Sequence, residues 1–169
     1  DGRRDADVRS ASELDAKIAW YCNLGRGACA ARHWITAAAD SASSVYATDL
    51  DGDGDADVLS ASAQDDKIAW YENLGSGVFG AQQVITTAAD AASSVYATDL
   101  DGDGDADVLS ASAQDDKIAW YENLMSSAYW DQLVSDTAAD TAASVTATDL
   151  HGDGEGGGLW ASTLHTKTP

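Results

Sequence analysis

The sequence predicts an all-β fold made of repeated four-stranded antiparallel sheets, which are the blades of a β-propeller. The main observation is a repeat: Ala42–Leu74 and Ala92–Leu124 are identical at every position, which sets a period of 50 residues. A fixed period of this kind is typical of repeat architectures. Short stretches rich in β-branched and aromatic residues also alternate with Gly- and Asp-rich turns. No apolar period of about 3.6 residues persists, so helices are not expected.

One complete repeat shows the four strands in order. The predicted strands are Ser44–Leu50, Asp57–Ser62, Lys67–Leu74 and Gln82–Thr87. An Asp/Gly loop joins the first two strands, and Asp65-Asp66 forms a tight turn between the second and the third. A turn at Gly75-Ser76-Gly77 precedes the fourth. A β-solenoid is the alternative architecture, but its repeats are usually shorter.

The repeats divide the chain into unequal parts. We expect a partial first blade at 1–41 that supplies strands two to four, blades at 42–91 and 92–141, and a degenerate further blade with a tail at 142–169. This amounts to about three blades, whereas closed propellers have about four to eight. Unpaired strand edges attract other strands. The prediction is therefore an open segment of a larger propeller, or assembly with further blades or a second copy.

Composition excludes several classes of protein. The net charge of −20, from 29 acidic against 9 basic residues, argues against nucleic acid and anionic membranes as partners. Hydrophobic residues make up 44% of the chain, with six Trp and six Tyr, which is too many for a disordered acidic tail. No apolar run reaches the length of about 18 residues that a membrane span requires.

The chain start and the two cysteines allow more limited expectations. No signal peptide is visible and the chain begins inside a repeat, which we interpret as a processed form or part of something longer. Cys22 and Cys29 flank a predicted hairpin loop. A disulfide between them and two separate thiols are equally open alternatives.

The most informative motif is the nonapeptide DLDGDGDAD, present at Asp49–Asp57 and again at Asp99–Asp107. Each copy places five carboxylates at alternate positions. Two unit charges about 4 Å apart repel by about 1 kcal/mol in water and by more in a protein, so this arrangement calls for a cation. Ca²⁺ takes about six to eight oxygen ligands and suits so many carboxylates better than Mg²⁺ does. The candidate metal residues are Asp49, Asp51, Asp53, Asp55, Asp57, Asp99, Asp101, Asp103, Asp105 and Asp107.

The loop DLDGDGDADV between two strands, followed by KIAWYENLGSGVF and a fourth strand, resembles the FG-GAP/VCBS repeat. That family includes the calcium-binding propeller blades of integrin α-subunits and many secreted bacterial and algal proteins. The resemblance implies Ca²⁺ in the loop between the first two strands. It implies side-chain ligands at Asp49, Asp51, Asp53 and Asp57 with the backbone carbonyl of Asp55, and at Asp99, Asp101, Asp103 and Asp107 with the carbonyl of Asp105.

Other metal loops fit less well. An EF-hand shares the start of the motif, but it needs a Glu at the twelfth loop position, where Ser60 and Ser110 stand, and helices on both sides. A solvated acidic turn is the remaining alternative. In the outer copies of the loop, Arg3, His151 and Gly157 replace acidic residues, so weak or no occupancy is expected there.

No nucleophile and base recur at a fixed spacing, so we expect no enzymatic activity. A Trp-Tyr pair recurs in each repeat, at Trp20, Trp70 and Trp120, and adjacent residues of a strand face opposite sides. The pairs are therefore expected to pack between blades, with a sugar-stacking rim as the alternative.

The functional hypothesis is an extracellular or secreted calcium-binding propeller acting in adhesion, ligand binding or assembly, with the periplasm or an organelle lumen as other locations. The alternatives are a carbohydrate-binding lectin, and a non-catalytic module of a larger secreted enzyme or complex.

Overall fold

The computed structural model describes residues 7–12, 14–23, 29–125, 131–148 and 158–162. Within these residues there are thirteen strands and no helix. Consequently, this part of the chain contains no helix that is long and apolar enough to cross a membrane.

The strands form four antiparallel sheets, in which each strand pairs with its neighbour in the chain. The first sheet contains β1 (Val8–Ser12), β2 (Lys17–Asn23) and β3 (Cys29–Thr36). The second contains β4 (Ala42–Thr48), β5 (Asp57–Ser62), β6 (Lys67–Tyr71) and β7 (Gln83–Thr86). The third contains β8 (Ala92–Thr98), β9 (Asp107–Ser112), β10 (Lys117–Glu122) and β11 (Asp131–Asp136). The fourth pairs β12 (Ala142–Ala147) with β13 (Gly158–Ser162).

The predicted fold class is confirmed: antiparallel sheets of up to four strands recur every 50 residues, as from β5 at Asp57 to β9 at Asp107. The third strand of the repeat is shorter than expected and ends at Tyr71 rather than Leu74. The reason is that Asn73 N–H donates to the carboxylate of Asp57 at 2.7 Å, and Asn73 pairs with Phe79 only as an isolated bridge. The predicted turn before this strand is present, with Asp66 at a φ of 54°.

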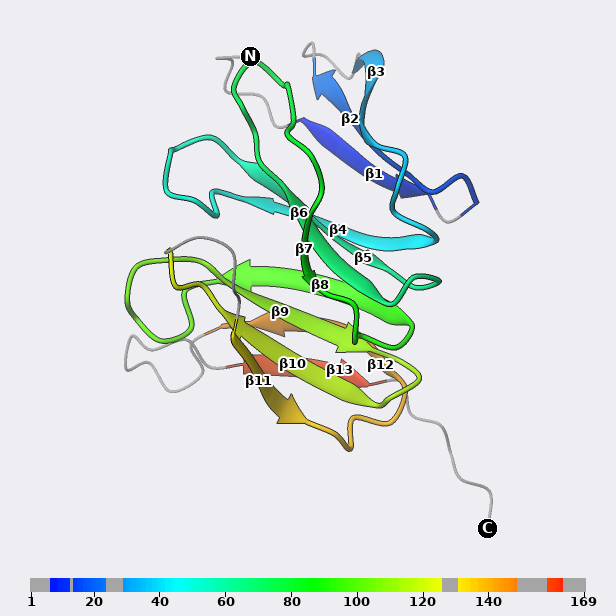
Figure 1. The fold of residues 1–169 in the computed structure, drawn as a ribbon, viewed down its shortest axis with the longest axis vertical. Helices are drawn as coiled ribbons and strands as arrows, with labels where there is room; N and C mark the ends of the chain where they lie inside the picture. The colour runs from blue at the N-terminus through cyan, green and yellow to red at the C-terminus, as the bar shows by residue number, and fades with distance from the viewer. Residues whose placement is uncertain (1–6, 13, 24–28, 126–130, 149–157, 163–169) are drawn as a thin grey trace.

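The first three sheets follow one another down Figure 1, the last two strands lie beside the third sheet, and the described strands do not close into a ring. The first strands of successive sheets are in contact, β4 with β8 and β8 with β12. Hydrogen bonds repeat along this line: Ser43 Oγ donates to the Ala92 carbonyl and Ser93 Oγ to the Ala142 carbonyl, both at 2.6 Å. The second sheet is thereby joined to the third, and the third to the fourth, by the same residue of the repeat.

Apolar cores lie between the sheets. Between the second and third sheets, Leu59 and Ile68 of one sheet meet Val108 and Tyr121 of the other, and all four are buried. Trp70 packs against the same core from the second sheet. Tyr therefore faces the preceding sheet and Trp the following one in the second and third sheets, which confirms packing between blades for these two aromatic pairs.

Some predictions fall outside the described residues. These include the acidic positions of the outer loops at 1–6 and 149–157. Cys29 pairs with Asn23 in the register of β2 and β3, next to Cys22, but its side chain is not among those described. The disulfide therefore stays a prediction.

Candidate metal centre

The acidic loop of each complete sheet connects its first two strands. In the second sheet β4 ends at Thr48 and β5 begins at Asp57, so the last acidic residue of the motif already belongs to a strand. The loop can turn this tightly because Gly52 and Gly54 adopt φ values of 77° and 92°, a region that residues with a Cβ rarely enter. The flanking elements are strands, which excludes an EF-hand at this loop.

Each loop gathers three carboxylates. Asp49, Asp51 and Asp57 offer oxygen atoms that all lie within 4.8 Å of one another, and Asp99, Asp101 and Asp107 do the same in the third sheet. Like charges at such separations repel. A bound cation would convert this repulsion into attraction.

Backbone N–H groups hold all three carboxylates in place: Asp51 accepts one such hydrogen bond, from Asp53 at 3.1 Å, and the other two carboxylates accept two each. Asp49 accepts hydrogen bonds from Gly52 at 2.8 Å and Gly54 at 2.9 Å, while Asp57 accepts from Leu50 at 2.9 Å and Asn73 at 2.7 Å. The corresponding bonds in the third sheet measure 2.7, 3.0, 3.0 and 2.8 Å. The same sequence thus gives nearly the same loop twice. Each carboxylate oxygen has a further lone pair, so these bonds leave capacity for a metal.

The remaining acidic residues of the motif lie apart from the clusters. Asp53 and Asp55 are exposed, and the Asp53 carboxylate accepts a hydrogen bond from the Asp55 N–H at 2.8 Å. Asp103 is exposed as well, and its carboxylate accepts the Asp105 N–H at 2.9 Å. A metal-ligand role for the Asp53 and Asp103 side chains, or for the backbone carbonyls of Asp55 and Asp105, stays a prediction.

Sequence reasoning missed the contribution of one asparagine. Asn73 donates through Nδ2 to the Ala56 carbonyl at 3.0 Å, in addition to its bond with Asp57. Its counterpart Asn123 donates both to the Ala106 carbonyl and, at 2.8 Å, to the Leu50 carbonyl of the preceding loop. This second bond links the metal loops of neighbouring sheets. The recurrence of Asn in the WYENL segment was the available signal.

Burial gives Asp57 an unusual proton affinity. Its side chain is fully buried, and this burial raises the pKa of its carboxyl to about 6, although the N–H groups of Asn73 and Leu50 lower it. The pKa of Asp107 is raised for the same reason. Without a bound cation, burial therefore disfavours the ionised form of each carboxyl.

The donor set fits Ca²⁺. It consists of hard carboxylate oxygens, with no nitrogen or sulfur donor in either cluster, and this is the ligand type that Ca²⁺ prefers. The fully buried member supplies a charge that only a positive partner can offset at neutral pH. Asp49, Asp51 and Asp57 would hold one ion, and Asp99, Asp101 and Asp107 a second.

The raised pKa predicts how the metal-free protein responds to pH. The folded state binds a proton at Asp57 below a pH of about 6, whereas the unfolded chain binds it only below the ordinary value of 3.8. The free energy of unfolding of the metal-free protein should therefore increase as the pH is lowered from about 7 to 5. The calcium-loaded protein should lose stability over the same range, since metal binding needs ionised carboxylates.

Thermal denaturation at both pH values, after dialysis against chelator and with added calcium, measures this. Asp57→Asn should reduce the pH response of the metal-free protein, which separates this carboxyl from the general decrease in negative charge. A metal-free protein that became less stable on acidification to about pH 5 would contradict the expected burial of an ionised carboxylate.

Comparison with known families agrees with this architecture. The model of the FG-GAP-like repeat matches the chain three times, at residues 1–60, 49–110 and 99–155. The chain belongs to the FG-GAP-like repeat family. Each of the two described acidic loops lies in the overlap of two successive matches.

One solved structure is similar over most of the chain. It is a lectin from Agrocybe aegerita with specific recognition of non-reducing terminal N-acetylglucosamine. The similarity has a TM-score of 0.55 at 17% identity and covers 92% of this FG-GAP-like chain but 49% of the lectin, so the chain spans about half of that protein. At this identity the similarity concerns the fold alone. A comparison with curated proteins finds no match.

Proposed function

We propose that this FG-GAP-like chain is a non-enzymatic calcium-binding propeller protein that acts outside the cytosol in adhesion, ligand binding or assembly. The observation that carries the proposal is the pair of matching three-carboxylate clusters, one in each complete sheet. Membership of the repeat family supports Ca²⁺ as the ion.

The ion has a structural role in this proposal. When bound, Ca²⁺ supplies the positive charge that offsets three converging carboxylates. Asp57 then serves two partners, because it lies in the cluster and also accepts the N–H groups of Leu50 and Asn73. The cluster is thereby connected to β5, to the start of the loop at Leu50 and to the segment after β6.

Counting bound ions tests the proposal. The intact chain should hold two Ca²⁺, one for each described cluster. Asp51→Ala and Asp101→Ala should each remove one ion, because each deletes a clustered ligand that accepts no hydrogen bond from a flanking strand. Elemental analysis or calorimetry gives the count.

The comparison variants decide which residues matter. Asp65→Ala removes an acid that pairs with Lys67 outside the loops, so its ion count should not change. Asp53→Ala tests a ligand that the acidic motif and the family resemblance imply but that lies outside the three-carboxylate cluster. A count of zero in the intact chain would refute the metal site, and a higher count would reveal binding in the outer loops.

A lectin is the second candidate. The similarity to a sugar-recognising propeller-like fold favours it, although that similarity covers the fold only. A glycan array with and without calcium distinguishes the two roles, because a pure scaffold binds no sugar at any calcium level. A third role, as a non-catalytic module of a larger secreted enzyme or complex, is tested by sequencing the complete gene.

A further inference from the structure

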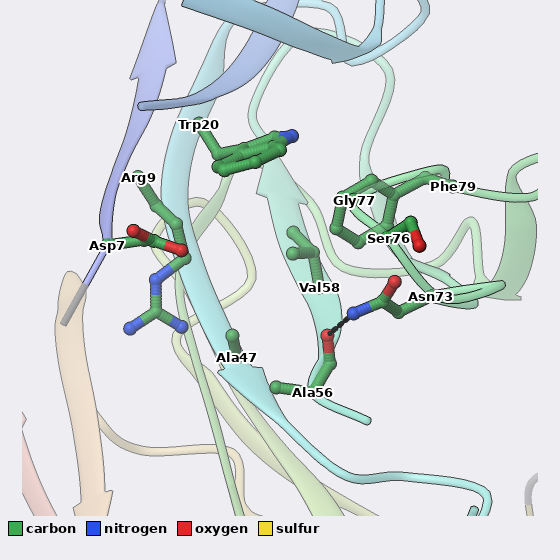
Figure 2. A pocket seen from close by; sticks show the side chains of 10 residues that line it. All are labelled: Asp7, Arg9, Trp20, Ala47, Ala56, Val58, Asn73, Ser76, Gly77 and Phe79. Atoms are coloured by element: carbon green, nitrogen blue, oxygen red, sulfur yellow. Dashed lines mark hydrogen bonds between the residues drawn. The ribbon is translucent and has the colours of Figure 1, made fainter. Parts of the chain in front are cut away.

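A pocket of about 510 Å³ opens between the first and second sheets. Figure 2 shows Asp7 and Arg9 on one side and Asn73 and Phe79 on the other, with the ring of Trp20 at one end. Its volume lies in the range of about 300–1,000 Å³ that is usual for small-molecule sites. The walls combine aromatic carbon with charged and amide groups.

This combination suits a sugar ring. A pyranose presents C–H groups on its faces and hydroxyl groups around its rim. The indole of Trp20 and the ring of Phe79 offer apolar, weakly negative faces to C–H groups. Arg9 is a donor, Asp7 an acceptor and Asn73 both, which matches hydroxyls that donate and accept. We propose that this pocket binds a single sugar ring, and that the metal loop of the second sheet fixes one of its walls.

The repeat itself shows what distinguishes this pocket. Asp7, Trp20, Ala47, Ala56, Val58 and Asn73 all have the same residue 50 positions later. Arg9 does not: its counterparts are Leu59 and Leu109. Leu59 is fully buried in the core between the second and third sheets, whereas Arg9 is exposed. Arg9 is therefore a polar side chain at a position where both complete repeats carry a buried leucine.

A continuous series of contacts connects the pocket to the metal loop. Ala56 lines the pocket and lies next to Asp57 of the carboxylate cluster. Asn73, also in the wall, donates to both: its N–H to the Asp57 carboxylate and its Nδ2 to the Ala56 carbonyl.

The series continues into the turn after β6. The Asn73 side-chain oxygen accepts the Gly75 N–H at 3.1 Å, which fixes the start of the turn that carries Ser76 and Gly77. Both of these residues line the pocket. Gly77 lies so close to Trp20 that a Cβ there would be 2.3 Å from the indole. An ion held by Asp57 thus stabilises the wall that faces Trp20.

This proposal rests on the lectin candidate above. Its first test uses the other repeats as a control. Arg9→Leu introduces the residue that both complete repeats carry, so the fold should be preserved. It should abolish binding of monosaccharides, measured by calorimetry with N-acetylglucosamine, glucose, galactose and mannose as probes. Arg32→Leu is the matched control: Arg32 lies over the ring of Trp34, outside the pocket, and should leave binding unchanged.

The second test addresses the metal loop. Asp51→Asn and Asp101→Asn should each remove one Ca²⁺, but only the first alters the loop that borders the pocket. We expect Asp51→Asn to weaken sugar binding about tenfold, a coupling within the usual range, and Asp101→Asn to change it by less than about twofold. Ion counts and melting curves confirm that both variants are folded and each lack one ion.

The outcomes separate the claims. If the intact protein binds none of the sugars, the lectin candidate fails and this site fails with it. If it binds sugar and Arg9→Leu binds equally well, the lectin candidate stands and the pocket assignment is wrong. If Asp51→Asn and Asp101→Asn weaken binding equally, or not at all, the connection between this metal loop and the pocket is refuted.

Discussion

Removal of calcium should lower the melting temperature of this protein by about 10–20 °C. A ligand that binds only the folded state stabilises it by about 2.7 kcal/mol per site at about 100-fold excess over Kd. Two clusters therefore contribute about 5 kcal/mol. For a chain of this size each kcal/mol corresponds to about 2–4 °C. Calorimetric scans with excess calcium and after addition of EGTA measure the shift.

The control for this experiment concerns electrostatic screening. With a net charge of −20, any added salt should stabilise the fold to some extent by reducing repulsion. Replacing Ca²⁺ by Mg²⁺ at constant ionic strength keeps the screening and removes the preferred ion, so the lower melting temperature should persist. An unchanged melting curve in excess EGTA, with no metal bound at the start, would show that the acidic loops are solvated turns.

The sequence was sufficient for the fold because the signals for it are local. Short β-branched stretches, tight turns and a fixed period determine where strands begin and end, and β5 has the predicted bounds, Asp57–Ser62. The third strand ended earlier than expected at Tyr71 because Asn73 donates to a side chain from another strand. Alternation along a strand cannot reveal such a contact, which depends on how the loop folds back.

The candidate metal site was predictable in composition and less so in geometry. Alternating carboxylates pointed to a cation, and three of the five in each loop do converge. Nothing in the pattern distinguishes Asp53, which is exposed, from Asp57, which is buried. That difference arises because β5 begins at Asp57 and places its side chain between two backbone N–H donors. The pocket at Arg9 depends similarly on packing between sheets rather than on any single repeat.

The second large effect is expected at Asp57, because this residue has two structural roles. Its carboxylate belongs to the cluster and also accepts the N–H groups of Leu50 and Asn73. Asp57→Ala removes the ion, worth about 2.7 kcal/mol at about 100-fold excess. It also leaves two donors unpaired at a cost of about 1–3 kcal/mol for a buried group. In calcium we expect a loss of about 5 kcal/mol in the free energy of unfolding, measured by denaturant titration.

Comparison with Asp51→Ala separates the two roles, because the Asp51 carboxylate is a cluster member whose hydrogen-bond partner is within its own loop. With calcium present, Asp51→Ala should lose only the contribution of the ion; in EGTA it should be at least as stable as the parent protein, because it removes one of the repelling charges. In EGTA at about pH 5, where the Asp57 carboxyl of the parent is protonated, Asp57→Ala should remain less stable than the parent, since its orphaned N–H groups do not depend on metal. Asp107→Ala should repeat this behaviour in the third sheet, where the same two bonds recur. If Asp57→Ala and Asp51→Ala were equally stable in both conditions, the buried carboxylate would act solely as a metal ligand, and its hydrogen bonds with the N–H groups of Leu50 and Asn73 would contribute nothing measurable.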